Sequence, residues 1–420
     1  MDQPVIILGA GIIGICTALS LAERGVAVRI IDRGEPGQET SFGNAGIISP
    51  WSVIPQSMPG VWRQIPQLMF GRAAPLSIRS AALPKMIPWG LRFLRQASEA
   101  RVRATADVME VLCAPSIDLY RRHLQGTGAE SLIKDSIYVH AFRDGSRANL
   151  KSLDYAIRQE KGANLELVGS EALQATEPAL SPDFNAAVLI HDQARALSPG
   201  RIGRVLAEKA RGLGVDFVSD NVRKLNRSDG DWQIVCDGGT HAAARVVVAM
   251  GAWSADLLAP LGLRMPLMAE RGYHLEFAQP GIEIRNSVMD VDAKLVASSM
   301  EAGVRIAGQA EFAPVDAPPD DRKRGQLRKL AKAAFPDLNT GVESFWMGHR
   351  PSFPDSLPVL GEAPEKQGLF LNFGHSHYGL MMAPKSGELL ADMVIGRASN
   401  ADVKALGAER FFLRCPVRTK

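Results

Sequence analysis

The beginning of the chain switches between two apolar patterns that predict a strand, a helix and a second strand. Residues 5–8 are all apolar and mostly branched, which is typical of a strand buried on both faces. From Ile12 the apolar residues recur on one face of a helix, and Gly25 marks its end. A second apolar strand over 26–31 leads directly into Asp32. We therefore expect a β-α-β unit at the amino terminus.

Similar patterns predict the elements of the remaining chain. Residues 50–125 combine many prolines with helical periodicity and indicate a helical insertion. Apolar runs and period-two alternation, with a hairpin turn at 228–230, predict strands at 215–222, 232–235, 245–250, 273–277, 304–307 and 368–373, and a helix over 379–395. The mixture of strands and helices predicts an α/β fold.

The turn between the first strand and the helix has glycine at three spaced positions. Gly9 allows a tight turn, Gly11 lets the backbone approach a pyrophosphate, and Gly14 permits close helix–strand packing. The helix start then offers free N–H groups to the phosphates. Asp32 follows 18 residues after Gly14, where a ribose-binding acid is expected, and its charge would repel the 2′-phosphate of NADP. The unit is therefore expected to bind a dinucleotide.

Three later segments favour FAD over NAD. Residues 40–48 are small and polar and can wrap a long ligand, although a surface turn would have the same composition. The strand 245–250 ends at Gly251, at the sheet edge where ligands bind. The strand 368–373 runs into a Gly/His loop before a helix whose positive end suits a reduced flavin. No second glycine-rich motif with its own strand and acidic residue is present, so no nicotinamide-binding domain is expected. The electrons that reduce the flavin are therefore expected to come from an organic substrate.

Length and composition limit the partners and the compartment. A chain of 420 residues predicts two domains, and 46% hydrophobic with 22% charged residues is ordinary for a globular protein. The net charge of +3, without a Lys/Arg block, gives no reason to expect nucleic-acid binding. Four scattered cysteines predict a reduced cytoplasmic protein and no metal site. No apolar run reaches the ~18 residues of a membrane-spanning helix.

In this order, the segments make the chain similar to the D-amino-acid oxidase/glycine oxidase/sarcosine oxidase superfamily. Within it, the chain most resembles bacterial D-amino-acid dehydrogenases of the small-subunit type and hydroxyproline dehydrogenases. The motifs that carry the resemblance are 9–14, Asp32, 40–46, 251–253, 348–351, 355–361 and Gly374-His375. After Gly-His, relatives usually have a Gly/Thr/Leu-type run, whereas this chain has Ser376-His377-Tyr378-Gly379, a departure that bears on the substrate preference.

The resemblance implies a discontinuous, Rossmann-like FAD-binding domain and a second α+β domain. Residues 1–50, 190–260 and 345–420 would build the first domain. Residues 51–189 and 261–344 would form the substrate domain, an antiparallel-rich sheet that caps the flavin. No cysteine lies near the expected flavin loops, so the FAD is expected to be noncovalent.

The resemblance also implies an activity, namely oxidation of an amino acid at the carbon that bears its amine. The substrate would be a D-amino acid or a hydroxyproline-like secondary amine, and the acceptor a quinone or another electron carrier. An oxygen-using oxidase, a flavin-binding subunit of a larger complex and an NAD-binding protein without flavin remain alternatives. The stretch 83–95 mixes apolar and basic residues. We expect it to be an ordinary helix packed on the core, with contact to the inner face of a membrane as the alternative.

The residues expected to contact the cofactor come from the motifs above and their neighbours. They are Gly9, Gly11, Ile12, Ile13, Gly14, Asp32, Arg33, Ser41, Asn44, Ala45, Gly46, Ile47, Val222, Gly251, Trp253, Gly348, Gly374, His375, Gly379 and Leu380.

Four residues are candidates for work on the substrate. The guanidinium of Arg350 is a planar, bidentate hydrogen-bond donor for a carboxylate, although an arginine before proline can also form a structural ion pair. The hydroxyl of Tyr273 is a second donor for that carboxylate, and a satisfied core tyrosine is the alternative. His377 and Tyr378 follow the Gly-His loop and are placed to line the pocket.

Overall fold

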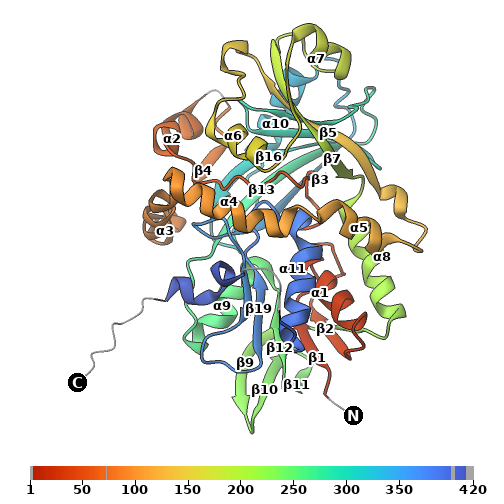
Figure 1. Cartoon of the computed structure of the whole chain (residues 1–420), viewed down its shortest axis with the longest axis vertical. Helices are drawn as coiled ribbons and strands as arrows, with labels where there is room; N and C mark the ends of the chain where they lie inside the picture. The colour runs from red at the N-terminus through yellow and green to blue at the C-terminus, as the bar shows by residue number, and fades with distance from the viewer. Residues whose placement is uncertain (1–2, 72, 399–402, 413–420) are drawn as a thin grey trace.

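The computed structural model of the chain describes residues 3–71, 73–398 and 403–412. A six-stranded sheet forms the lower half of the view in Figure 1 and is parallel except for one edge strand. Its strands, in spatial order, are β18 (Val359–Glu362), β19 (Leu369–Phe373), β12 (Val246–Val248), β1 (Val5–Leu8), β2 (Val28–Asp32) and β8 (Asp216–Ser219). The parallel β-α-β unit predicted at the amino terminus is at its centre.

The centre of the first sheet is buried on both faces because β1 and β12 are apolar at every position. Ile7 packs into a layer of helices, whereas its neighbour Ile6 packs against a small three-stranded sheet. The helices are α1 (Ile12–Ala22), α8 (Pro199–Gly212), α11 (Gly379–Val394), α4 (Glu99–Cys113) and α5 (Ser116–Leu124). The small sheet contains β11 (Gly239–Ala243), β10 (Asp231–Cys236) and β9 (Val222–Ser228), and the short helix α9 (Ser254–Leu258) lies beside it.

A ten-stranded, mainly antiparallel sheet forms the upper half of the view. Its main path is β17 (Glu343–Ser352), β13 (Met268–Phe277), β16 (Gly303–Phe312), β15 (Leu295–Met300), β14 (Ser287–Asp290), β5 (Ile133–Phe142), β7 (Ala186–Ala196) and β3 (Ile47–Ile48). The strand β4 (Leu76–Ile78) pairs with β16, and β6 (Leu165–Gly169) pairs with β7. The predicted combination of a Rossmann-like sheet and an antiparallel-rich second sheet is therefore confirmed.

The two faces of the second sheet differ. One face packs against α10 (Arg322–Ala334), with Leu275 and Ile306 of the sheet in the same core as Leu327 of the helix. The other face carries polar residues and turns toward the first sheet. The remaining helices are α2 (Val61–Phe70), α3 (Leu83–Gln96), α6 (Leu153–Glu160) and α7 (Ser170–Thr176).

Two of the expected domain boundaries fall inside strands. The boundary at 190 cuts β7 and the boundary at 345 cuts β17, although both strands pair entirely within the second sheet. Hydrogen-bond partners far away in the sequence decide which sheet a strand joins, and local composition does not report them. We therefore propose boundaries that follow the sheets, after Ala196 and after Ser352.

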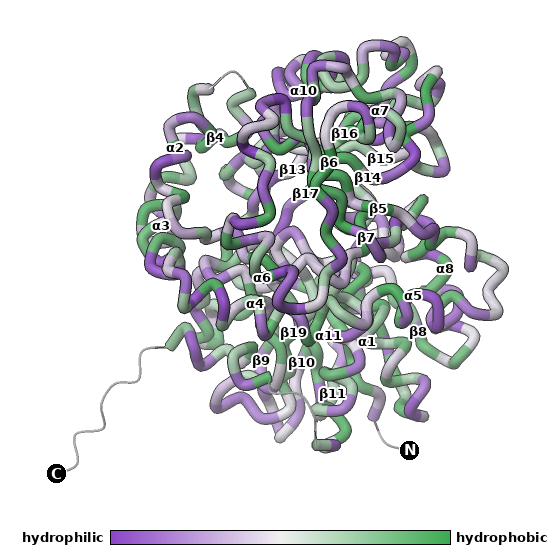
Figure 2. Tube along the Cα trace, turned by 45° about the horizontal axis from the view of Figure 1, so that its top comes forward, coloured by the Kyte–Doolittle hydropathy of each residue, from purple (hydrophilic) through white to green (hydrophobic). Residues whose placement is uncertain are grey.

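The helix over 83–95 is present as α3, and one side of it packs on the second sheet as expected: Trp89 is buried with Met268 and Phe312, and Met86 and Phe93 pack against this cluster. Trp89 is its only buried residue, and α2 buries none. Figure 1 shows both helices at the left edge of the molecule, and Figure 2 shows hydrophobic and hydrophilic residues interleaved along them. No helix among the described residues is both long and apolar enough to cross a membrane.

Candidate active site

A cavity of about 1340 Å³ lies where the two large sheets face each other. The turn between β1 and α1 lines one end, and the polar face of β13, β16 and β17 lines the other. Pockets for a single drug-sized ligand are about 300–1,000 Å³. The cavity is therefore large enough for a dinucleotide together with a small substrate.

The turn from β1 to α1 is built for close approach. Gly9 has a φ of 109°, and a Cβ atom there would lie 2.6 Å from the carbonyl oxygen of Ala249. A Cβ on Gly14 would lie 1.9 Å from the carbonyl oxygen of Gly9. A Cβ on Gly11 would meet nothing closer than 3.8 Å, so this backbone faces open space. The first turn of α1 contains no acidic residue; the N–H of Ile12 donates to Oγ of Ser41 at 3.1 Å, and the other N–H groups of this turn can donate to phosphate oxygens.

The acid at the end of β2 lines the same end of the cavity. The carboxylate of Asp32 accepts N–H bonds from Ala10 at 2.6 Å and Gly34 at 2.8 Å, which fixes its orientation. Next to it, the guanidinium of Arg33 lies 4.6 Å from the ring centre of Trp253. Of the twenty residues expected to contact the cofactor, only Gly14 and Gly46 do not line the cavity.

At the other end, the buried carboxylate of Glu270 connects three side chains, two from β17 and one from the loop before α11. Its Oε1 atom lies 3.0 Å from Nη1 of Arg350 and 2.6 Å from Nε2 of His377, and its Oε2 atom accepts the hydroxyl of Ser352 at 3.1 Å. Burial raises the pKa of Glu270, but His377 and Arg350 outweigh that effect and bring it to about 2. Glu270 is therefore an anion at neutral pH.

Two glycines make room for the large side chains of this site. A Cβ on Gly272 would lie 2.2 Å from Nη2 of Arg350, so the guanidinium lies directly over the backbone of β13. A Cβ on Gly348 would lie 2.0 Å from the ring of Trp346. That ring stacks on the imidazole of His274 with centroids 5.0 Å apart. Sequence reasoning identified Gly348 and Arg350 but missed Glu270, Gly272 and Trp346.

The comparison with family models decides the identity. The model of the DAO family of FAD-dependent oxidoreductases matches residues 4–393. The chain belongs to this family. It is an FAD-dependent oxidoreductase, and the glycine turn, the first turn of α1 and Asp32 fit the pyrophosphate and the ribose of FAD.

Individual relatives agree with the family assignment. The DAO-family chain is 34% identical to a D-amino-acid oxidase of Bradyrhizobium diazoefficiens over 416 residues, 97% of this chain and 98% of that protein. Its fold matches glycine oxidase from Geobacillus kaustophilus with a TM-score of 0.76 at 22% identity, covering 97% and 98% of the two chains. The fold also matches L-proline dehydrogenase from P. horikoshii with a TM-score of 0.74 at 19% identity, covering 98% of each.

The structure gives Tyr273 a different surrounding from the one expected of a substrate ligand. Its hydroxyl donates to Glu311 at 2.5 Å and accepts the backbone N–H of Asp320 at 3.2 Å. Burial and the bond to Glu311 raise its pKa to about 12. Tyr273 is among the residues that line the cavity, but because side chains alternate along β13, its ring stacks with Phe345 on the face of the strand opposite to the Glu270 side chain. The alternative of a satisfied core tyrosine therefore describes Tyr273, and we do not assign it to the substrate.

The loop before α11 places three predicted residues along the cavity. His375 is buried, its Nε2 atom lies 3.2 Å from Oγ of Ser386, and burial lowers its pKa to about 3. Tyr378 donates its hydroxyl to the carbonyl of Ile54 at 2.6 Å, and burial raises the pKa of this hydroxyl. Of the three, only His377 has its side chain paired with a charged group of the cavity.

A second part of the cavity wall is aromatic and comes from β5 and α6. His140 and Tyr155 are buried, and Nδ1 of His140 lies 2.8 Å from the hydroxyl of Tyr155. The hydroxyl of Tyr138 points to the sulfur of Met289 at 3.4 Å. Among the described residues, Nε2 of His140 has no hydrogen-bond partner. This nitrogen is buried within the wall, and nothing in the sequence pattern marked it.

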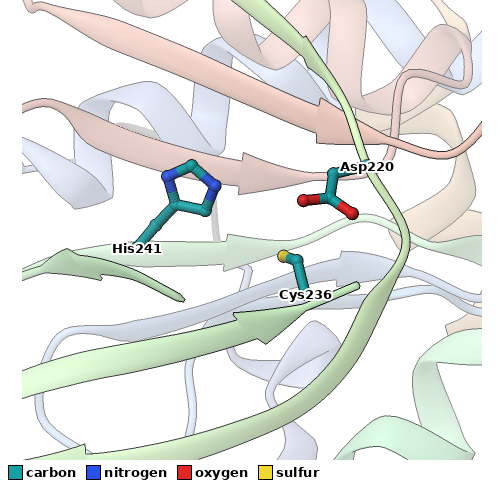
Figure 3. Close-up of side chains that lie close together, drawn as sticks. All are labelled: Asp220, Cys236 and His241. Atoms are coloured by element: carbon teal, nitrogen blue, oxygen red, sulfur yellow. The ribbon is translucent and has the colours of Figure 1, made fainter. Parts of the chain in front are cut away.

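The described residues also contain one group of possible metal ligands, away from the charged end of the cavity. Asp220, Cys236 and His241 come together beside the three-stranded sheet, with ligand atoms within 4.8 Å of one another (Figure 3). The Asp220 carboxylate already accepts backbone N–H groups of Asn221 and Gly238. Burial, followed by Asp220, raises the pKa of the Cys236 thiol to about 11. No other observation points to an ion at this group, so we assign no metal here.

Proposed function

We propose that this DAO-family enzyme oxidises an amino acid at the carbon bearing its amine. The position of the Arg350 guanidinium supports this most strongly. Within the described part of the chain, Nη1 makes both of its hydrogen bonds, to Glu270 and to the carbonyl of Gln309. The edge formed by Nη2 and Nε is left to a ligand, and this edge suits the two oxygens of a carboxylate.

The charges of the site suit a zwitterion. Arg350 and Glu270 together carry no net charge. An amino acid with an ionised carboxylate and an ammonium group is also neutral overall. The substrate carboxylate would add a second anion to Arg350, and the ammonium group would compensate for it near Glu270. A carboxylic acid without an amine would leave one uncompensated negative charge beside the buried Glu270 carboxylate, which is unfavourable.

We assign the removal of the amine proton to His377. Its Nε2 atom donates to Glu270, so the neutral ring carries its lone pair at Nδ1. Nδ1 would accept one proton from the substrate ammonium, and Glu270 would stabilise the resulting imidazolium, as a carboxylate does for histidine in other proton transfers. The now neutral amine can donate its lone pair to the α-carbon as a hydride leaves.

The overall reaction removes two electrons from the substrate. The α-carbon loses a hydride and a carbon–nitrogen double bond forms, which gives an iminium ion, and this ion releases one proton from nitrogen to become the neutral imine. FAD, when bound, supplies the acceptor for the hydride. Water then converts an open-chain imine into a 2-oxo acid and ammonia, whereas a ring amine gives a cyclic imine.

For the substrate we propose a D-amino acid or a hydroxyproline-like secondary amine. The relative that is 34% identical over nearly the whole chain is a D-amino-acid oxidase, which supports the first class. For the acceptor we propose a quinone or another carrier. The name of the same relative supports the alternative, an oxidase that reduces oxygen.

Anaerobic reduction of the purified enzyme tests this function. The holoenzyme alone is mixed with single D-amino acids, L-amino acids, hydroxyprolines, sarcosine or glycine while the flavin absorbance is followed. We expect one class of amino acid to bleach the flavin, and failure of every class would refute the proposal. Reoxidation by dye or by oxygen then separates dehydrogenase from oxidase. Bleaching by the isolated chain would also exclude a subunit that is active only in a complex.

A further inference from the structure

The outer surfaces of α2 and α3 concentrate exposed apolar side chains. Nine large hydrophobic residues of the described chain are exposed, and six of them lie on these two helices. Phe70 is 82% exposed and Ile87 is 63% exposed. A monomeric soluble protein rarely groups such residues, and a cluster of them marks an interaction surface. The six are Trp62, Phe70, Leu83, Ile87, Leu91 and Leu94.

The segment that contains α2 and α3 has basic residues but no acidic ones. Residues 40–98 contain six of the 48 basic residues of the chain and none of the 45 acidic ones. The segment therefore carries six positive charges, while the remaining 42 basic and 45 acidic residues leave the rest of the chain slightly negative. Arg63, Lys85, Arg92 and Arg95 are exposed on α2 and α3 among the apolar residues. An apolar surface bordered by basic residues matches the interface of an anionic bilayer.

The inner sides of the two helices belong to the cavity wall. Ile65 and Leu68 of α2 and Phe93 of α3 line the cavity that reaches the charged end of the site. The indole N–H of Trp89 donates to the carbonyl of Ser352 at 3.2 Å, which ties α3 to the strand that carries Arg350. One pair of helices thus separates the cavity from the apolar outer surface.

We propose that α2 and α3 form a docking surface for an anionic membrane. Trp62, Phe70, Ile87 and Leu91 enter the headgroup region, and the four basic residues contact anionic headgroups. A second copy of the chain would bring two faces of the same positive charge together, which is unfavourable. Docking places the helical wall of the cavity at the lipid surface, so an electron acceptor dissolved in the lipid could approach it there. Binding itself does not depend on the proposed function.

Vesicle flotation with the FAD-loaded enzyme tests the proposal directly. We expect the enzyme to float with vesicles that contain about 30% phosphatidylglycerol, and to float much less with pure phosphatidylcholine or at about 1 M salt. A wild-type enzyme that does not distinguish the two vesicle types would overturn the proposal. So would a purified dimer that separates when the apolar residues are changed, because the partner of the surface would then be a second copy.

Two matched pairs of variants locate the contact. Each Lys or Arg contributes about 1 kcal/mol near an anionic surface, so each neutralisation should lower the partition coefficient by about fivefold. The charge variant combines Arg63→Gln, Lys85→Gln, Arg92→Gln and Arg95→Gln. Its control makes the same change in net charge elsewhere, with Lys134→Gln, Lys151→Gln, Lys224→Gln and Lys329→Gln.

The second pair removes apolar contact. The apolar variant carries Phe70→Ser, Ile87→Ser and Leu91→Ser, and its control changes the three exposed residues outside the helices, with Leu167→Ser, Leu213→Ser and Val342→Ser. We expect the surface variants to lose vesicle binding while turnover with a soluble dye and FAD content stay near wild type. Equal loss of binding in a variant and its control would refute the assignment. If the apolar variant does not fold, the charge pair decides the question.

Discussion

Replacing Glu270 by glutamine removes one charge from the centre of the site with little change in shape. In the wild type the carboxylate orients Nη1 of Arg350 and accepts the proton-bearing Nε2 of His377. A glutamine amide is neutral, and only its oxygen can accept a hydrogen bond. It therefore cannot serve both donors as well as the carboxylate does. Arg350 would lose its charged partner, and His377 could adopt the other tautomer.

The pKa of Glu270 sets the size of the effect. It is about 2 in the folded protein and 4.5 when unperturbed, so the site favours the anion by about 3 kcal/mol, at about 1.4 kcal/mol per pKa unit. Because folding lowers this pKa, the stabilisation is fully present above about pH 4.5 and is lost as the pH falls toward 2. If the same interactions hold Arg350 and His377 in the transition state, Glu270→Gln should lower kcat/KM by a hundredfold or more.

Steady-state kinetics and chemical unfolding of the FAD-loaded protein measure both consequences at neutral pH. A control is Glu311→Gln, which removes a buried carboxylate from the opposite face of the same sheet, where it binds Tyr273 and Arg271. We expect both variants to be less stable and only Glu270→Gln to lose activity. If Glu270→Gln keeps kcat/KM within about threefold of wild type, the carboxylate does not position the two groups.

Three other predictions follow from separate parts of the structure. Acid precipitation should release yellow FAD into the supernatant, because no cysteine among the described residues lines the cavity, and flavin that stays in the pellet would show a covalent bond. Gly272→Ala should raise KM about tenfold or more, because its Cβ would overlap the Arg350 guanidinium; an unchanged KM would show that this guanidinium position is not needed for binding. His123 is fully buried, and burial, followed by Arg122, lowers its pKa from 6.5 to about 4. As the pH falls below 6.5, His123 is therefore protonated in the unfolded chain but not in the folded protein, and this destabilises the fold. Between pH 7.5 and 5.5, the free energy of unfolding should fall by about 1.3 kcal/mol more in the wild type than in His123→Leu. Urea unfolding at the two pH values measures this difference, and equal losses would contradict a neutral buried His123.

The amino-terminal unit was predictable because its determinants are local. The apolar run of β1, the three glycines and Asp32 lie within one short stretch, and each has a physical role that depends on near neighbours. The helix predicted over 379–395, which is α11 in the structure, was also predictable from local sequence, because its start directly follows the Gly-His loop. The long-range order of the first sheet came from the resemblance and not from local pattern.

The pairing of Glu270 with Arg350 at the centre of the site could not be predicted from local sequence. Glu270 and Arg350 are paired residues of adjacent strands β13 and β17, 80 positions apart, and only the strand register brings them together. Alternation along β13 separates Glu270 from Tyr273 onto opposite faces, but the sequence does not say which face is the cavity. The helical period of α3 was visible, whereas its exposure depends on what packs against it.

The proposed reaction requires Arg350 as the partner of the substrate carboxylate. The most direct test compares kcat/KM for one amino acid with kcat/KM for its carboxamide, in the wild type and in Arg350→Ala. Charge-assisted hydrogen bonds contribute about 1.5–3 kcal/mol each, so the wild type should prefer the acid by a hundredfold or more. Arg350→Ala should remove that preference, Arg350→Lys should restore part of it, and FAD content should stay near wild type. An Arg350→Ala enzyme that still prefers the acid as strongly as the wild type would contradict the assignment.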